Sequence, residues 1–106
     1  MEIPKKIRIS GVDYIVELTD VPICLEHKEC YGCVDYDSGR IRISTSGEIS
    51  DAHRCITVLH EMLHAILADR DVSTEDDGEE KIVDQLSRGL YQVIRDNPGI
   101  FYERGR

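Results

Sequence analysis

Apolar and polar residues alternate through the first half of the chain, and this period of two is typical of β-strands. The alternation covers residues 6–18, interrupted by a turn at residues 10–11, and returns in residues 34–43 around a turn at residues 37–39. The pattern therefore predicts two β-hairpins. The intervening stretch, residues 20–32, shows no such period and is predicted to be irregular.

The second half of the chain instead repeats apolar residues at helical spacing. Ser50 is a suitable N-cap for a first helix that runs to about Asp69. A second helix is predicted to begin within residues 73–78, where Asp77 stands at capping-box spacing from a glutamate, and to end near Asn97 before a proline. The apolar positions expected to face the core are Cys55, Ile56, Leu59, Met62, Leu63, Ile66 and Leu67 in the first helix, and Ile82, Val83, Leu86, Leu90, Val93 and Ile94 in the second.

Together these elements predict an α+β fold. A small, mostly antiparallel sheet made of two hairpins packs on the first helix, and the second, C-terminal helix packs beside it. The length of 106 residues suits a single domain, residues 1–106, with one hydrophobic core. Residues 99–106 are expected to form a short tail.

The charge and the apolar runs argue against two classes of partner. Lysine and arginine number 13 and aspartate and glutamate 21, which gives a net charge of −8. A surface this acidic repels phosphate backbones, so no nucleic acid is expected as a partner. No apolar run is long enough to cross a membrane, and no apolar segment of a signal peptide follows the first lysines. The expected location is therefore cytoplasmic, with the four cysteines reduced.

The predicted first helix contains an HExxH sequence, His60 to His64. Histidines four residues apart lie one above the other on a helix, so both imidazoles can bind one metal ion. Glu61 projects to the side of that face, where it can serve as the base for an attacking water molecule instead of as a ligand. The motif is typical of zinc-dependent hydrolysis. Two unrelated surface histidines on a core helix are the less favoured interpretation.

A zinc site with catalytic character needs a third protein ligand, and the predicted second helix offers one. Glu80 and Asp84 are four residues apart on one face and border the apolar face at Val83. If the two helices pack antiparallel, this stripe meets the histidines, Glu80 binds the metal and Asp84 holds the outer nitrogen of a histidine. Glu79 is the rival ligand, but no carboxylate follows it four residues later.

The order of HEMLH, a short acidic linker, EEKIVDQLS and a closing RDNP resembles the small phage-type metallopeptidases of the minimal gluzincin group, which are related to the ImmA/IrrE family. The resemblance covers most of the chain, from KIRISGVDYIVEL through GCVDYDSGRIRI to Pro98. In contrast to larger gluzincins, only about fifteen residues separate the HExxH sequence from its acidic partner helix.

The resemblance implies a minimal zincin-like fold and a zinc-dependent peptidase. His60, His64 and Glu80 match the Zn²⁺ ligands, Glu61 matches the catalytic base, and Asp84 matches the acid that supports a ligand. A protein or peptide substrate would then add to the edge of the sheet at the strand before the active-site helix. That strand is expected to be Arg40–Ser44.

Larger gluzincins also supply a histidine or tyrosine that stabilises the oxyanion. Tyr91, Tyr102 and His53 are candidates in this chain, although a structural role is favoured for each. Cys24, His27, Cys30 and Cys33 recur every three residues and could bind a second metal ion, although an irregular loop with incidental thiols is favoured.

Three functions follow from these patterns. The favoured one is a zinc-dependent metallopeptidase that hydrolyses peptide bonds. The second is a zinc-stabilised interaction module in which the HExxH sequence is inert. The third is a regulator of phage or mobile-element origin that binds zinc and sequesters a partner by β-addition, without cleaving it.

Overall fold

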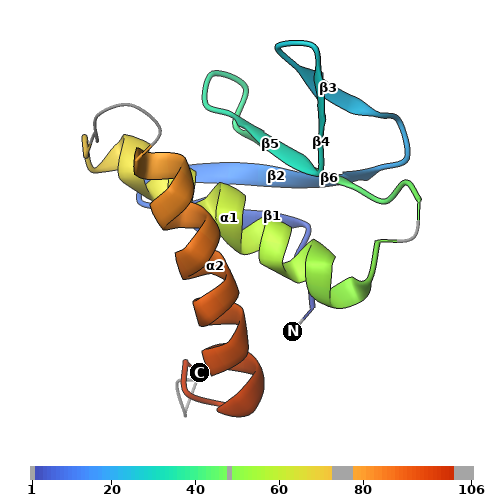
Figure 1. The fold of residues 1–106 in the computed structure, drawn as a ribbon. Helices are drawn as coiled ribbons and strands as arrows, with labels where there is room; N and C mark the ends of the chain where they lie inside the picture. The colour runs from blue at the N-terminus through green and yellow to red at the C-terminus, as the bar shows by residue number, and fades with distance from the viewer. Residues whose placement is uncertain (1, 48, 73–77, 102–106) are drawn as a thin grey trace.

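The computed structural model describes residues 2–47, 49–72 and 78–101 (Figure 1). A four-stranded sheet has the order β1-β2-β6-β5, and a separate pair of short strands, β3 and β4, stands beside it. The strands are β1 Lys6–Ile9, β2 Val12–Thr19, β3 Ile23–Leu25, β4 Lys28–Cys30, β5 Gly32–Asp35 and β6 Arg40–Ser44, and the helices are α1 Asp51–Asp69 and α2 Gly78–Asp96. The predicted α+β fold is confirmed.

Both predicted hairpins are present in the sheet. Strands β1 and β2 pair antiparallel, and so do β5 and β6. The hairpins join through β2 and β6, which pair parallel, with Val16 opposite Ile41. Ile41 and Ile43 are fully buried, so β6 lies in the interior of the sheet and contributes to the centre of the core.

The prediction that Arg40–Ser44 forms the edge of the sheet is wrong. This strand, β6, is paired on both sides, with β2 and with β5, and has no edge to which a further strand could add. The physical reason is the burial of its two isoleucines, which is greatest when strands lie on both sides. The strand nearest α1 that ends the sheet is β5, Gly32–Asp35.

Residues 20–32 are also more regular than predicted, because β3 and β4 pair antiparallel as a third hairpin. Its turn is formed by Glu26 and His27, both at positive φ, 50° and 65°. Two-residue hairpin turns favour Asn-Gly or similar pairs in that conformation, so a Glu-His turn gives no sequence signal. Prediction from turn residues therefore missed the hairpin.

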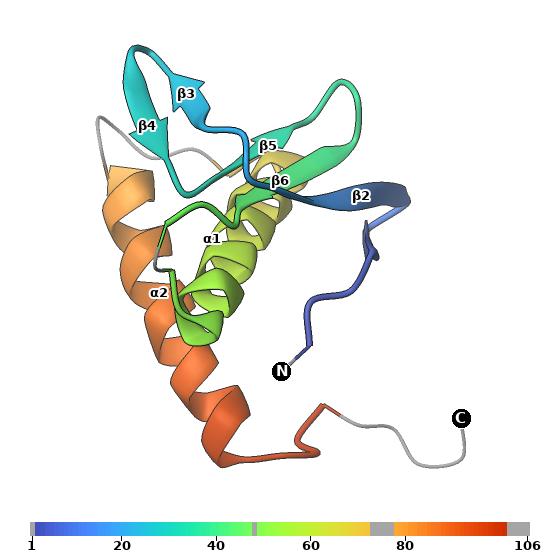
Figure 2. The same ribbon diagram turned by 90° about the vertical axis from the view of Figure 1, so that its right-hand side faces the viewer.

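Helix α1 lies between the sheet and α2 (Figure 2). The core between the sheet and α1 contains Ile9, Tyr14, Val16, Ile41, Ile43, Val58 and Ala65. The predicted cap of α1 is confirmed, because the backbone N–H of His53 donates to the Ser50 hydroxyl at 3.1 Å. Helix α2 begins at Gly78, inside the predicted window, whereas the predicted capping residue Asp77 lies outside the described residues.

The predicted core face of α2 is only partly correct. Ile82, Leu86 and Val93 are 49%, 51% and 36% exposed, whereas Val83 and Ser87 are fully buried. The reason is that α2 packs mainly on one neighbour, α1, so only a narrow stripe of it is covered. The predicted tail begins with a turn at residues 99–101. Neither described helix is long and apolar enough to span a bilayer.

Candidate metal centre

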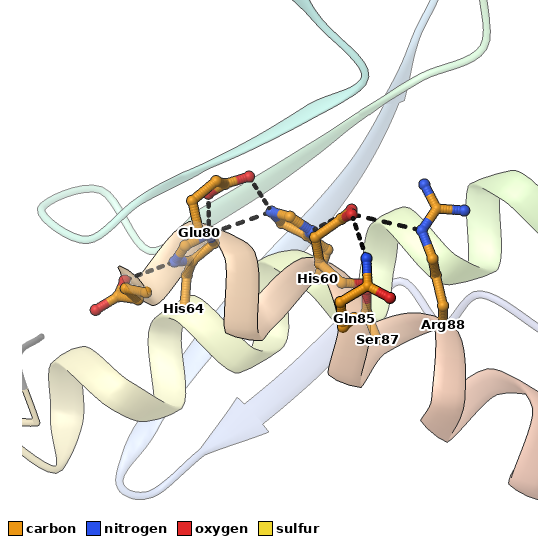
Figure 3. Close-up of polar contacts among 8 residues, drawn as sticks. His60, His64, Glu80, Gln85, Ser87 and Arg88 are labelled. Carbon is orange, nitrogen blue, oxygen red and sulfur yellow. Dashed lines mark hydrogen bonds and ion pairs between the residues drawn. The ribbon is translucent and has the colours of Figure 1, made fainter. Parts of the chain in front are cut away.

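Helix α1 supplies two histidines one turn apart, as the HExxH sequence predicts. The Nε2 atoms of His60 and His64 lie 3.2 Å apart, and the two rings are tilted at 60° to each other. Both side chains are 15% exposed, at the contact between α1 and α2. Because the sheet holds α1 along its other side, the two imidazoles are presented together toward α2 (Figure 3).

The carboxylate of Glu80 reaches both histidines from α2. One oxygen, Oε1, lies 2.9 Å from His60 Nε2, and the other, Oε2, lies 2.8 Å from His64 Nε2. The three potential ligand atoms lie within 4.8 Å of one another, so this group could hold a metal ion. A tetrahedral ion with bonds of about 2.0–2.1 Å separates its ligands by about 3.3 Å, so small outward shifts suffice to admit one.

Two further carboxylates of α2 lie on the outer sides of the imidazoles. Glu79 Oε2 is 2.7 Å from His64 Nδ1, a hydrogen-bond distance. Asp84 Oδ1 is 3.9 Å from His60 Nδ1, within ion-pair distance and longer than a hydrogen bond. Carboxylates in these positions fix the ring orientation and leave Nε2 free to bind a metal. Sequence reasoning considered Glu79 only as a rival ligand and missed its contact with His64, because adjacent glutamates give no periodic signal.

The pKa values of the two histidines shift in opposite directions, because burial dominates at one and the carboxylates dominate at the other. Burial lowers the pKa of His60, and the nearby Glu80 opposes this only in part. Burial acts on His64 in the same sense, but the carboxylates of Glu79, Glu61 and Glu80 together outweigh it and raise the His64 pKa. His60 therefore favours the neutral, ligating form more strongly than His64 does.

Glu61 lies on the side of α1 that turns toward β5 and is only 7% exposed. Burial raises its pKa to about 7, with Glu80 adding to the effect and His64 opposing it. The close approach of β5 requires Gly32, because a Cβ there would lie 2.7 Å from Thr57 Cγ2 and 3.4 Å from Glu61 Cγ. A glycine thus lets the edge strand cover the carboxylate of the predicted base.

The histidines and Glu80 line a cleft of about 770 Å³ between the helices, β5 and the β3–β4 hairpin. Of the oxyanion candidates predicted, His53 lines this cleft, whereas Tyr91 does not and has Arg95 over its ring at 5.8 Å. Tyr102 lies outside the described residues.

Sequence reasoning missed two tyrosines of the cleft. Tyr31 and Tyr36 flank β5 and line the cavity, and the Tyr31 ring meets His53 at 4.5 Å between centroids. Burial raises the pKa of Tyr36, and the charges of Glu79 and Glu61 raise it further. In the sequence, the one sign that these tyrosines line the cleft is that they stand immediately before and after the residues of β5.

The cysteine-rich loop does not form a second metal centre in the part of the chain that the structure describes. Cys24 is exposed on β3, and Cys30 donates weakly to a backbone oxygen, that of Lys28, at 3.7 Å. Cys30 and Cys33 line the cleft, and burial raises the pKa of Cys33, with Glu61 as the next cause. The His60, His64 and Glu80 group is the one metal-holding arrangement found among the described residues.

Comparison of the chain with protein-family models, with curated proteins and with solved structures yields no match. The resemblance to minimal gluzincins therefore rests on the residues quoted for it.

Proposed function

We propose that this chain is a zinc-dependent metallopeptidase of the minimal gluzincin type. The observation that carries the proposal is the convergence of His60, His64 and Glu80 beside the buried carboxyl of Glu61, on the floor of an open cleft. Two imidazoles and one carboxylate are a donor set typical of catalytic zinc sites in peptidases. The outer contacts of Glu79 and Asp84 support the same assignment, because ligating histidines usually bond a carboxylate through their other nitrogen.

Bound zinc would supply Lewis-acid activation at this position, polarising the peptide carbonyl and lowering the pKa of water. Glu61 accepts the proton of the attacking water as its oxygen bonds to the carbonyl carbon, and then delivers that proton to the leaving amine. Glu61 is buried next to β5 and still lines the cleft, where it can reach a water molecule bound there. Glu79 holds His64 in the ligating orientation through a hydrogen bond, and Asp84 faces the outer nitrogen of His60 at ion-pair distance.

The substrate in this proposal is an extended protein or peptide segment that pairs with β5. Among the described strands, β5 pairs only with β6, so its other edge is available for a further strand. This edge borders the cleft through Gly32, Cys33 and Val34. Backbone hydrogen bonds along such an edge give affinity largely independent of sequence.

The test compares Glu61→Gln with the wild type, both loaded with zinc, on a pool of random octapeptides and on intact proteins analysed by mass spectrometry. We expect the variant to keep zinc and its melting temperature but to lose peptide cleavage by about 10²–10⁴-fold, because Gln cannot accept the proton. Glu29→Gln, on exposed β4 away from this group, is the matched control and should cleave like the wild type.

Equal cleavage by Glu61→Gln and wild type would contradict the role of Glu61. Full zinc binding with no cleavage by either protein would contradict the peptidase and favour the zinc-binding regulator.

A further inference from the structure

The direction of β5 fixes the direction of a peptide bound beside it, if the proposed function holds. Strand β5 begins at Gly32, which lies against Thr57 of α1. The turn that follows β5 lies toward the C-terminal end of α1 (Figure 1). Strand β5 therefore runs from the Thr57 end of the cleft toward the His64 end.

Antiparallel pairing is the more stable arrangement per residue, so the added peptide runs in the opposite sense to β5. Its N-terminal side then occupies the His64 end of the cleft. Its C-terminal side continues past His60 toward Thr57 and the following turns of α2.

One guanidinium lies at this C-terminal end. Arg88 lines the cleft and stands one helical turn beyond Asp84 on α2, and Figure 3 shows His64, His60 and Arg88 in that order along the site. Its Nε lies 3.6 Å from Asp84 Oδ2, and its side chain is 54% exposed. Within the described part of the chain, its two terminal amino groups have no protein acceptor.

The outer edge of the Arg88 guanidinium is open to a negatively charged group. Lys28 and Glu26 both line the same cleft from the β3–β4 hairpin, so their opposite charges offset each other and Arg88 itself supplies the attraction. Asp84 meets only Nε of Arg88 and also lies beside His60, so it does not occupy the guanidinium's outer edge. That edge presents two parallel N–H donors, the geometry that binds a carboxylate bidentately.

We propose that Arg88 binds a carboxylate of the substrate on the C-terminal side of the cleaved bond. Two sources share this chemistry: the free C-terminus of a peptide, and an aspartate or glutamate side chain within a longer segment. Arg88 is thus a specificity residue that positions the leaving portion of the substrate, and it does not take part in proton transfer.

Binding is measured without turnover. Zinc-loaded Glu61→Gln protein is immobilised and offered three pools of octapeptides whose random positions contain no acidic residue. One pool has free C-terminal carboxylates, one has C-terminal amides, and one has C-terminal amides with a single aspartate at a varied position. Mass spectrometry of the retained peptides gives the enrichment of each pool.

We expect retention of carboxylate-bearing peptides to exceed that of neutral amides by about tenfold or more. Adding Arg88→Gln should abolish the difference, and Arg88→Lys should restore part of it. Arg95→Gln is the matched control, because Arg95 has a similar exposure, 57%, and pairs with Asp96 away from the cleft. Circular dichroism and zinc content establish that each variant is folded and loaded.

Enrichment of free acids alone identifies the C-terminus as the source, and enrichment of the aspartate pool identifies a side chain. Either result supports the proposal if it depends on Arg88. Equal retention of all three pools, or a preference that survives Arg88→Gln, would overturn it. Cleavage by the wild type without any carboxylate preference would refute this role and keep the peptidase. A carboxylate preference that depends on Arg88, without any cleavage by the wild type, would support the role of Arg88 and contradict the peptidase.

Discussion

The two helices hold their halves of the candidate site very differently. The α1 half is embedded: His60 and His64 are 15% exposed, and Glu61 is covered by β5. The α2 half is open, with Glu80 63% exposed and only Val83 and Ser87 of that helix buried. The sheet thus packs against the helix that carries the histidines and Glu61, whereas the position of Glu80 depends on a narrow contact between α1 and α2. In the proposed peptidase, the metal ion itself would complete the attachment of α2.

The largest expected effect is that of removing the metal. A ligand present at a thousand times its dissociation constant stabilises the folded state by about 4 kcal/mol, and in the proposed site zinc would join α2 to α1. We therefore predict that chelation lowers the melting temperature and strips hydrogen-exchange protection from α2 amides more than from α1 amides. Equal loss of hydrogen-exchange protection on both helices would contradict the idea that α2 is held less firmly than α1. An unchanged melting temperature after verified zinc removal would contradict it as well.

Substitution of the two adjacent glutamates should separate a ligand from its support. We predict that Glu80→Ala lowers zinc affinity by more than about 100-fold, because it removes a direct ligand, whereas Glu79→Ala, which removes only the partner of His64 Nδ1, lowers it by about 10–100-fold. Competition with a chelating dye measures both affinities. A larger loss in Glu79→Ala would reverse the two roles.

The narrow attachment of α2 can be tested with neighbouring apolar residues. Val83→Ala leaves a cavity at a fully buried position, so we expect the free energy of unfolding to fall by about 2 kcal/mol. Ile82→Ala, at a position 49% exposed, should change it by less than about 0.5 kcal/mol. Urea unfolding of the metal-free protein measures both, and similar losses would show that α2 is buried on a wider face.

A smaller loss of stability than that of Val83→Ala is expected at the contact of β5 with α1. Gly32→Ala should destabilise the protein by at least about 1 kcal/mol, because its methyl group meets Thr57 Cγ2 at 2.7 Å. Thr57→Ser removes that methyl group and keeps the hydroxyl that donates to the His53 carbonyl at 2.9 Å. The double variant should regain part of the lost stability in thermal unfolding. A Gly32→Ala protein as stable as the wild type would show that β5 approaches α1 less closely.

The features of the fold and of the candidate site that the sequence predicts correctly are short-range features. The two hairpins and the facing stripes of His60, His64 and Glu80 depend on spacings of two or four residues, and the Ser50 cap depends on the residue type at the start of the helix. Those spacings determine which side chains share a face, whatever the rest of the fold does.

Apart from the β3–β4 hairpin, whose turn residues give no local signal, the errors concern long-range neighbours. The resemblance implies an edge strand at Arg40–Ser44, and periodicity does not reveal that β6 pairs with β2 as well as with β5, which leaves Gly32–Asp35 at the edge. Nor does it reveal that α2 has one main packing partner, which leaves Ile82 and Leu86 exposed. The contacts of Tyr36 and Arg88 with the cleft likewise arise only after distant segments meet.

X-ray absorption at the zinc edge of the purified, zinc-loaded protein would show whether two histidines and a carboxylate hold the ion. We expect two imidazole nitrogens and only oxygen besides them, with all bonds at about 2.0–2.2 Å, and loss of this signature in His64→Ala. A zinc–sulfur shell at about 2.3 Å would place the ion in the cysteine-rich loop instead, and would contradict the site on α1 and α2.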